Sequence, residues 1–333
     1  MKKILQLDKN SPKPKYRQII DSIINGIEHK HFVKGDKVPS INKISSAFGL
    51  SRDTVILAFN ELKSMGVIKS QLGKGYYITS TDVQQEENIF VLFDELNTYK
   101  EDLYNSFIKA LKGKTNVDIY FHHHNLKVFR NLILKNAGNY TSYVIMPSTF
   151  ENISHLISKL PFGKVYMLDR LKPELKNYSV VYQDYEQDFY DALVEGILLL
   201  KNYRKLIFVN QGGKEHEQRS TGFSRFCEEN NFKFEIIKSL VGVRPELHEA
   251  YFLTLDRDLI EIVKIAKDYN YKLGKKFGIV SFNDTILKEV VADGITTIST
   301  DFAEMGKILA KMVIEKKQEQ IHIPSKLIIR NSL

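Results

Sequence analysis

The sequence predicts an α+β winged helix-turn-helix head joined to an α/β body of two lobes, each built on a doubly wound parallel sheet. Three observations predict this fold class. The 333 residues exceed what one hydrophobic core usually serves. Residues 1–80 carry 14 Lys/Arg and 6 Asp/Glu, whereas residues 81–333 carry 34 of each, so the net charge of +8 lies in the first quarter of the chain. Beyond residue 88, short apolar runs alternate with amphipathic stretches.

The first helix of the head is predicted after Tyr16. Isoleucines recur there at helical spacing and share one face: Ile19, Ile20, Ile23, Ile24 and Ile27. Phe32, Gly35 and Asp36 then mark a turn.

Two more helices follow with a very short connection. Ser40 is predicted to cap the second helix, which ends at Gly49, and Ser51 caps the third, which ends at Gly66. The inward face of the third helix is Val55, Ala58, Phe59, Leu62 and Met65, and its outward face is Arg52, Asp53, Ile56, Asn60 and Lys63. The segments VIKS and YYITS, joined by QLGKG, indicate a hairpin. Three helices and a hairpin make a winged helix-turn-helix.

The chemistry of this head favours double-stranded DNA as partner. A recognition helix enters the major groove by its N-terminal end, where free N–H groups also favour phosphate. Ser51 and Thr54 can donate there, and the planar fork of Arg52 matches guanine O6 and N7. In the hairpin turn, Gly73 permits close approach to the DNA backbone and Lys74 brings charge to it. A lysine-rich surface alone would explain the charge, but not this pattern.

The stretch GDKVPSINKISSAFGLSRDTVILAFNELKSMGVIKSQLGKGYYI resembles the GntR-type DNA-binding domain over its whole length. The resemblance implies that Arg52, Thr54 and Gly73 contact DNA and that Ser40 opens the second helix. Asn42 stands where the family usually has an arginine, and Ile56 where some members have another. The operator of a relative therefore does not transfer to this chain. The full predicted DNA-facing set is Ser40, Asn42, Ser51, Arg52, Asp53, Thr54, Ile56, Gly73 and Lys74.

The polar segment 81–88 (TDVQQEEN) is predicted to be a linker between the head, residues 1–80, and the body, residues 89–333. Continuous apolar strands separated by helices indicate parallel sheets covered on both faces. The predicted strands are 89–93, 117–121, 143–146, 164–168, 179–182, 205–209, 250–255 and 277–282. The length of the body favours two lobes with a ligand in the cleft at the strand carboxyl ends.

Polar side chains follow several of these strands and suit a polyhydroxylated ligand. They are Asp169, Arg170, Gln183, Asp184, Glu215, His216, Arg219, Asp256, Asp258, Asn283 and Asp284. Aromatic faces for a sugar ring are expected from Phe93, Tyr99 and Phe282. The alternative is that Asp or Asn at a strand end only caps the next helix, which weighs most at Asp184 and Asp284.

The order LDR, VVYQD, RxxGF, VSFNDT and ITTISTDF resembles the effector domain of LacI-type repressors, which is related to periplasmic sugar-binding proteins. The resemblance covers about residues 89–333 and implies sugar contacts from Asp169, Arg219, Asn283 and Thr300. Asn283 replaces the usual aspartate, and Asp256–Arg257 or Arg257–Asp258 replaces the usual Asn-Asp. The chain thus resembles a GntR-type head on a LacI-type body.

Other classes of protein are disfavoured. There is no GxGxxG after the first body strand and no GxSxG, and we find no convincing catalytic constellation. Consecutive residues His122–His124 would point to opposite faces of a strand, which disfavours a shared metal ion. We therefore expect neither cofactor nor metal. The single Cys227, the absence of a long apolar run and the MKKILQLDKN start predict a soluble, cytoplasmic chain without membrane contact.

The sequence therefore predicts a homodimeric transcriptional regulator that binds an inverted-repeat operator and is controlled by a small sugar. Repression relieved by sugar is favoured over activation, and L-fucose or L-arabinose are the sugars that the resemblance favours. A sugar-metabolising enzyme with an autoregulatory DNA-binding head is the alternative.

Overall fold

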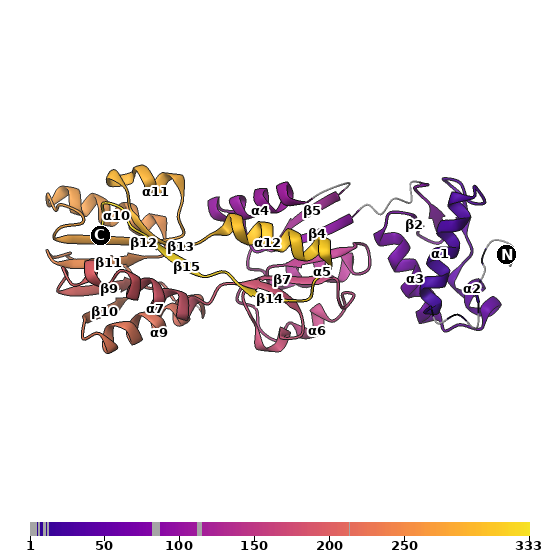
Figure 1. The fold of residues 1–333 in the computed structure, drawn as a ribbon, viewed down its shortest axis with the longest axis horizontal. Helices are drawn as coiled ribbons and strands as arrows, with labels where there is room; N and C mark the ends of the chain where they lie inside the picture. Colours follow the sequence, from indigo (N-terminus) through magenta and orange to yellow (C-terminus); the bar gives the residue numbers. More distant parts are fainter. Residues whose placement is uncertain are drawn as a thin grey trace.

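The computed structural model describes residues 5, 7, 8, 11, 13–81, 87–111, 115–212 and 214–333, with only the backbone for residues 214–216. Three bodies lie in a row: a helical head at one end, a first α/β lobe in the middle and a second lobe at the other end (Figure 1). The predicted fold class is confirmed. No helix in the described part of the chain is long and apolar enough to cross a membrane.

The head consists of three helices and a small sheet. The helices are α1 (Lys15–Glu28), α2 (Ile41–Phe48) and α3 (Arg52–Ser64). The strands lie in the order β1-β3-β2, with β1 (Lys37–Val38), β2 (Ile68–Gln71) and β3 (Gly75–Ile78). β2 and β3 form the predicted antiparallel hairpin, and the two-residue β1, which the sequence did not indicate, pairs with β3. The apolar faces of the three helices close over the sheet in one core.

Local capping explains why the second and third helices start where they do. Ser40 accepts a hydrogen bond from the backbone N–H of Lys43 at 3.3 Å, and Ser51 accepts one from that of Thr54 at 3.1 Å. Gly49 ends α2 in the left-handed conformation at φ 66°, which glycine adopts without strain. The predicted caps and the short turn between the two helices are therefore confirmed.

The first lobe is a six-stranded parallel sheet in the order β14-β8-β7-β6-β4-β5. Its strands are β4 (Glu87–Phe93), β5 (Thr115–Phe121), β6 (Ser142–Ile145), β7 (Val165–Asp169), β8 (Ser179–Tyr182) and β14 (Gln320–His322). Its helices are α4 (Thr98–Ala110), α5 (Leu126–Asn136), α6 (Ser154–Ile157) and α12 (Phe302–Glu315). Separate apolar cores fill the two faces of the sheet. β4 begins at Glu87, so the last two residues of the predicted linker lie in a strand.

The second lobe has a six-stranded sheet in the order β10-β9-β11-β12-β13-β15, of which only β15 is antiparallel to its neighbour. Its strands are β9 (Lys205–Val209), β10 (Lys233–Ile237), β11 (Glu249–Leu253), β12 (Phe277–Phe282), β13 (Thr296–Thr300) and β15 (Ser325–Ile328). Its helices are α7 (Tyr185–Glu195), α8 (Ile197–Leu200), α9 (Lys214–Glu229), α10 (Asp256–Asp268) and α11 (Ile286–Val290).

The chain passes between the two lobes three times, after β8, after β13 and after β14. The body is therefore not two consecutive halves of sequence, because α12 and β14 return to the first lobe and β15 completes the second. Parallel strands end at the same edge of a sheet, so the carboxyl ends of β7, β8 and β13 lie close to these crossings. This arrangement positions the cleft.

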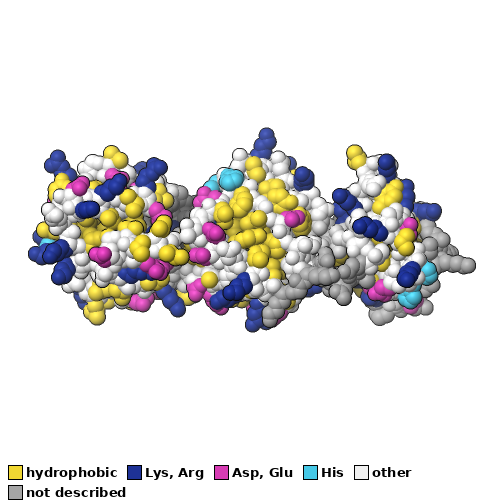
Figure 2. Space-filling view, turned by 90° about the horizontal axis from the view of Figure 1, so that it is seen from above, with side chains coloured by type: hydrophobic (Ala, Val, Ile, Leu, Met, Phe, Trp, Pro, Cys, Tyr) yellow, Lys and Arg dark blue, Asp and Glu magenta, His cyan; other side chains and the backbone are white. Residues whose placement is uncertain are grey.

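One face of the body carries exposed apolar side chains on both lobes. On the second lobe, Ile286, Leu287 and Val290 of α11 are 79, 69 and 70% exposed. On the first lobe, half-buried apolar residues lie on α4 and β5, namely Tyr104, Leu111, Val117, Ile119 and Phe121. α4, β5 and α11 lie on the same side of the row of bodies (Figure 1), and Figure 2 shows apolar side chains gathered over both lobes on this side.

Close packing of α12 on α4 gives a test of the first lobe. A Cβ atom at Gly306 would lie 2.3 Å from the carbonyl oxygen of Leu103 on α4. Alanine in a helix normally gains about 0.5–1 kcal/mol over glycine, but overpacking costs about 1–3 kcal/mol. We therefore expect Gly306→Ala to lower the free energy of unfolding, measured by urea denaturation. Lys307→Ala on the exposed side of α12 is the control, and equal stability of the two variants would contradict this packing.

Candidate functional site

The start of α3 is open to solvent on the head. Ser51, Arg52 and Asp53 are exposed and Thr54 is half-buried. The Oγ of Ser51 lies 2.8 Å from the Oγ1 of Thr54, while the Ser51 oxygen also caps the backbone N–H of Thr54. Arg52 forms no ion pair with any described residue, so its fork is available to a ligand. The helix start therefore combines exposed N–H groups, hydroxyls and a free guanidinium.

Most of the other predicted DNA-facing residues are also exposed on the surface of the head. Ser40 and Asn42 are exposed at the start of α2, and Gly73 and Lys74 are exposed in the turn between β2 and β3. Gly73 has φ 69°, a left-handed conformation that explains why glycine stands there. Ile56 is half-buried on α3.

One residue of the predicted outward face of α3 faces the body instead. A Cβ atom at Gly138, which follows α5, would lie 2.9 Å from the Cγ of Asn60. Asn60 therefore packs against the first lobe. Helical periodicity identifies which side chains leave the head core, but it does not say which of them another domain covers.

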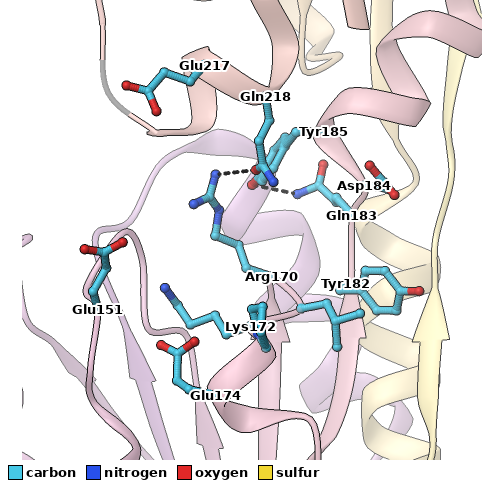
Figure 3. Close-up of a pocket in the computed structure, with 12 residues that line it drawn as sticks. Glu151, Arg170, Lys172, Glu174, Tyr182, Gln183, Asp184, Tyr185, Glu217 and Gln218 are labelled. Carbon is cyan, nitrogen blue, oxygen red and sulfur yellow. Dashed lines mark hydrogen bonds between the residues drawn. The ribbon is translucent and has the colours of Figure 1, made fainter. Parts of the chain in front are cut away.

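A cavity of about 410 Å³ lies between the two lobes. Figure 3 shows Arg170 and Lys172 projecting into it from the first lobe, with Glu217 and Gln218 of α9 on the opposite wall. An Nη2 hydrogen of Arg170 bridges the cavity by donating to the Oε1 of Gln218 at 3.2 Å. The remaining lining residues are Glu151, Leu171, Pro173, Glu174, Tyr182, Gln183, Asp184 and Tyr185.

The ring of Tyr185 is contacted by two arginines, one from each lobe. The guanidinium carbon of Arg170 lies 4.8 Å from the centre of this ring, and that of Arg219 lies 4.5 Å from it. Arg219 also lies 4.7 Å from the centre of the Phe282 ring. Arg219 is only 8% exposed and forms no hydrogen bond or ion pair with any described residue. Among the described residues, its N–H donors therefore have no hydrogen-bond acceptor, which favours a ligand oxygen as partner.

A buried polar network joins the ends of strands in both lobes. Asp169, at the end of β7, accepts hydrogen bonds from the Nε2 of Gln183 at 2.6 Å and from the Oη of Tyr185 at 2.9 Å. The Oε1 of Gln183 accepts from the Oγ1 of Thr300, at the end of β13, at 2.7 Å. Asp169 has φ 81°, a costly conformation for a residue with a side chain, so the surrounding bonds hold it in place.

Further charged groups stand at the strand ends of each lobe. In the first lobe, the Nζ of Lys100 lies 2.5 Å from the Oδ1 of the buried Asp94. Burial lowers the pKa of Lys100, but Tyr99 and Asp94 raise it above its ordinary value overall. In the second lobe, Lys288 is 3% exposed, and burial lowers its pKa. Lys100 and Lys288 are thus both buried amines, each with a carboxylate within 3 Å of its Nζ.

Among the polar residues that the sequence indicated for a ligand, Arg170, Gln183 and Asp184 line the cavity, and several others with described side chains do not. Phe93 is wrong as a cavity residue: it is 1% exposed in the core of the first lobe, against Tyr104. Its strand is covered on both faces, so the end of an apolar run is core rather than wall. Tyr99 packs on Phe302, with 4.7 Å between ring centres, and burial raises its pKa.

The strand ends of the second lobe bond among themselves. Asp258 accepts from the Nε2 of Gln211 at 3.0 Å, and Asp256 pairs with Lys288 at 2.9 Å. The carbonyl oxygen of Asn283 accepts from the Nζ of Lys288 at 2.9 Å. None of these predicted residues lines the cavity. His216 lies on α9, but its side chain is outside the described residues.

The histidine run lies at the end of β5 and in the turn after it. His122 is buried with its Nε2 3.0 Å from the carbonyl oxygen of Met146, whereas the Nδ1 of His124 lies 2.9 Å from the Oγ of Ser148. The two rings therefore serve different partners. Among the described residues, no three His, Cys, Asp or Glu side chains are grouped so that they could hold a metal ion.

The cavity residues besides Arg170 come from four segments of the chain: 151, 171–174, 182–185 and 217–218. Gln183, Asp184 and Tyr185 follow β8 at the first crossing, and Gln218 precedes Arg219 on α9. Gln183 and Asp184 were identified as strand-end polar residues, but the likeness to known sugar contacts did not include them. Lys172 precedes and Glu174 lies in a 3-10 helix of three residues (Pro173–Leu175), which is too short to show a sequence periodicity.

Comparison with known proteins assigns both parts of the chain. Residues 15–78 match the bacterial regulatory proteins of the gntR family. The head is a GntR-type DNA-binding domain. Residues 197–333 match the periplasmic binding protein-like domain. This range forms most of the second lobe and includes α12 and β14 of the first lobe. The chain therefore combines a GntR-type head with a periplasmic binding protein-like body, the domain composition of a transcriptional regulator.

Individual relatives match one part each. The uncharacterized HTH-type transcriptional regulator YhcF of Bacillus subtilis is 26% identical over 102 residues, which is 31% of this chain and 78% of YhcF. YdfD of the same organism, another uncharacterized HTH-type regulator, is 40% identical over 62 residues, 19% of this chain but only 13% of YdfD. A LacI family transcriptional regulator from Lactobacillus casei, solved with bound sucrose, has TM-score 0.60 and 15% identity over 74% of this chain and 99% of its own. This last likeness shows the fold of the body.

Proposed function

We propose that this chain is a DNA-binding transcriptional repressor whose affinity for its operator is lowered when a small sugar binds in the cleft. The observation that carries the proposal is the combination of an exposed recognition-helix start on a basic head with a cavity between two lobes. Beside this cavity lies Arg219, whose donors have no acceptor among the described residues. A sugar that bridges the lobes favours their closed arrangement and changes DNA affinity by no more than its differential affinity for the two arrangements.

The DNA-binding half of the proposal places α3 in the major groove. Its exposed start carries Arg52 for a guanine, Ser51 and Thr54 for phosphate or base edges, and Asp53 beside them. Ser40 and Asn42 reach the flanking phosphates, while Gly73 and Lys74 follow the backbone from the hairpin turn. The half-buried Ile56 suits contact with a thymine methyl group.

Arg52 offers a test of base recognition. We expect Arg52→Ala to cost about 1–3 kcal/mol of operator binding and to flatten base preference, because the bidentate guanine contact is lost. The operator for this test is selected from random duplexes with the unaltered protein, and affinity is measured by band shift at fixed salt. Arg52→Lys is the matched control, since it keeps the charge and loses the fork. Unchanged affinity of the alanine variant would remove Arg52 from the groove.

The cleft suits a hydroxyl-rich ligand because both hydrogen-bond donors and acceptors line it. Arg170, Lys172 and Gln218 supply donors, and Glu151 and Asp184 supply acceptors. Tyr182 and Tyr185 add aromatic faces for the C–H side of a sugar. The likeness of the body to a regulator solved with bound sucrose supports this ligand class. A monosaccharide such as L-fucose or L-arabinose remains our choice within it.

Arg219 offers a test of ligand binding. We expect Arg219→Ala to weaken sugar binding about tenfold or more, since charged hydrogen bonds are lost, and to leave ligand-free DNA binding intact. A thermal-shift panel of sugars identifies the ligand, and calorimetry measures its affinity. Arg225→Ala is the control: this arginine lies on the same helix but bonds Glu186 and Gln187 instead of facing Tyr185. Full-strength binding by Arg219→Ala would exclude this arginine from the pocket.

We also propose that two copies pair through the apolar face that α11, α4 and β5 share. Three large side chains exposed on so short a helix are costly in water, and a second apolar patch lies on the same face of the first lobe. A two-fold dimer through this face presents two equivalent heads, as an inverted-repeat operator requires.

The α11 patch offers a test of this pairing. We expect Ile286→Glu to raise the dissociation constant of the dimer at least about tenfold, because a charge would be buried without a partner. Analytical ultracentrifugation measures the constant. Leu198→Glu is the control, as Leu198 is 78% exposed on α8, away from this patch. If both variants stay dimeric at the concentration of the parent protein, pairing uses another surface.

A further inference from the structure

α3 has a third face, besides the core face and the DNA-facing face. Leu57, Asn60, Glu61 and Ser64 recur at intervals of three and four residues, so they form one stripe along the helix. All four line a small cavity against residues of the first lobe, among them Lys159, Leu160, Pro161 and Lys164. The recognition helix thus lies against the body along its C-terminal half, while its N-terminal end stays exposed.

An ion-pair cluster lies on this stripe. The Oε2 of Glu61 lies 2.6 Å from the Nζ of Lys164 on the first lobe, and its Oε1 lies 3.7 Å from an Nη1 of Arg17 on α1. The side chains of Glu61 and Lys164 are 16 and 23% exposed, so the pair is partly shielded from water. One carboxylate therefore joins two elements of the head to the body.

Two further contacts reinforce the docking. The Nδ2 of Asn88, on β4, donates to the carbonyl oxygen of Ser64 at 2.8 Å, which caps the C-terminal end of α3. Asn60 packs closely on Gly138, where any larger residue would collide with it. α3 is thus held to the first lobe at three points, by a hydrogen bond, an ion pair and close packing. Three points of contact fix the orientation of α3 relative to the first lobe.

The docking point lies at one end of a strand whose other end reaches the cleft. Lys164 immediately precedes β7, and Asp169 ends it, followed by Arg170 in the cavity. A strand of five residues spans about 17 Å. β7 is paired on both sides, with β6 and β8, so it moves as part of the sheet rather than by itself.

We propose that the Glu61–Lys164 contact docks the recognition helix on the first lobe. In the dimer, this docking fixes the distance between the two DNA-binding heads. This inference rests on the proposed DNA-binding function. The docked head leaves the start of α3 free, so docking does not block DNA. Instead it makes the protein selective for one distance between half-sites, since heads on free linkers would accept several distances.

Lys164→Glu tests the proposal without altering the head. It places two carboxylates together and so releases α3, while the DNA-facing residues stay as they are. The probes are duplexes with one selected half-site, and inverted repeats of that half-site with spacers of different length. We expect the parent protein to prefer one spacer, and Lys164→Glu to lose about fivefold or more of that preference with unchanged affinity for the single half-site.

Lys164→Arg is the matched control. It keeps a positive charge opposite Glu61 and leaves the net charge of the chain unchanged, so the spacer preference should stay. If Lys164→Glu keeps the full preference, or if Lys164→Arg loses it, the docking proposal is overturned. If the parent protein selects no duplex at all, the proposed DNA-binding function fails instead.

The docking can also be tested without DNA, by measuring the distance between the head and the first lobe. Spin labels on cysteines at the exposed positions Lys34 and Lys135 report the distance between head and first lobe. Cys227 does not compete for the label, because it is buried and burial raises the pKa of its thiol to about 12. We expect a narrow distance distribution in the parent protein, a broad one in Lys164→Glu and a narrow one in Lys164→Arg. A broad distribution in the parent protein would overturn the proposal.

Discussion

The site depends on one topological constraint: the backbone crosses between two parallel sheets at their carboxyl ends. The crossings after β8, β13 and β14 bring the ends of strands from both lobes close together, at the boundary between the lobes. Asp169, Gln183 and Thr300 are hydrogen-bonded there in a single chain, although 117 positions separate the last two. A network across a crossing couples the lobes, because moving one lobe relative to the other must stretch or exchange these bonds.

Electrostatics adds a second layer to this geometry. Arg170 and Arg219 contact the ring of Tyr185, and each belongs to a different lobe. A cation on an aromatic face gains about 0.5–2 kcal/mol without using its hydrogen-bond donors. The arginines are thus held in position by the ring, and Arg170 also donates to Gln218 across the cavity.

Sequence reasoning recovered most of the head and only part of the cleft, for identifiable reasons. Ser40, Gly49 and Ser51 carry local capping chemistry, which sequence displays directly. The edge strands β10, β14 and β15 were absent from the predicted strands because their exposed residues break the apolar runs. Cavity residues such as Lys172 and Gln218 depend on how the lobes meet, and no local pattern encodes that. The prediction that Phe93 lines the cavity was wrong because an aromatic residue at a strand end can pack in the core as well as line a ligand site.

The core of the head is built only from the head's own residues. Such a unit can be exchanged between proteins during evolution or by design, and a sensor of one metabolite can thereby acquire a new set of target genes. The contact of Glu61 with Lys164 sets a condition on that exchange. A DNA-binding domain moved onto this body would need an acidic residue at the helical position of Glu61 to dock in the same way. Without that residue, the hybrid protein would accept operators with several distances between half-sites.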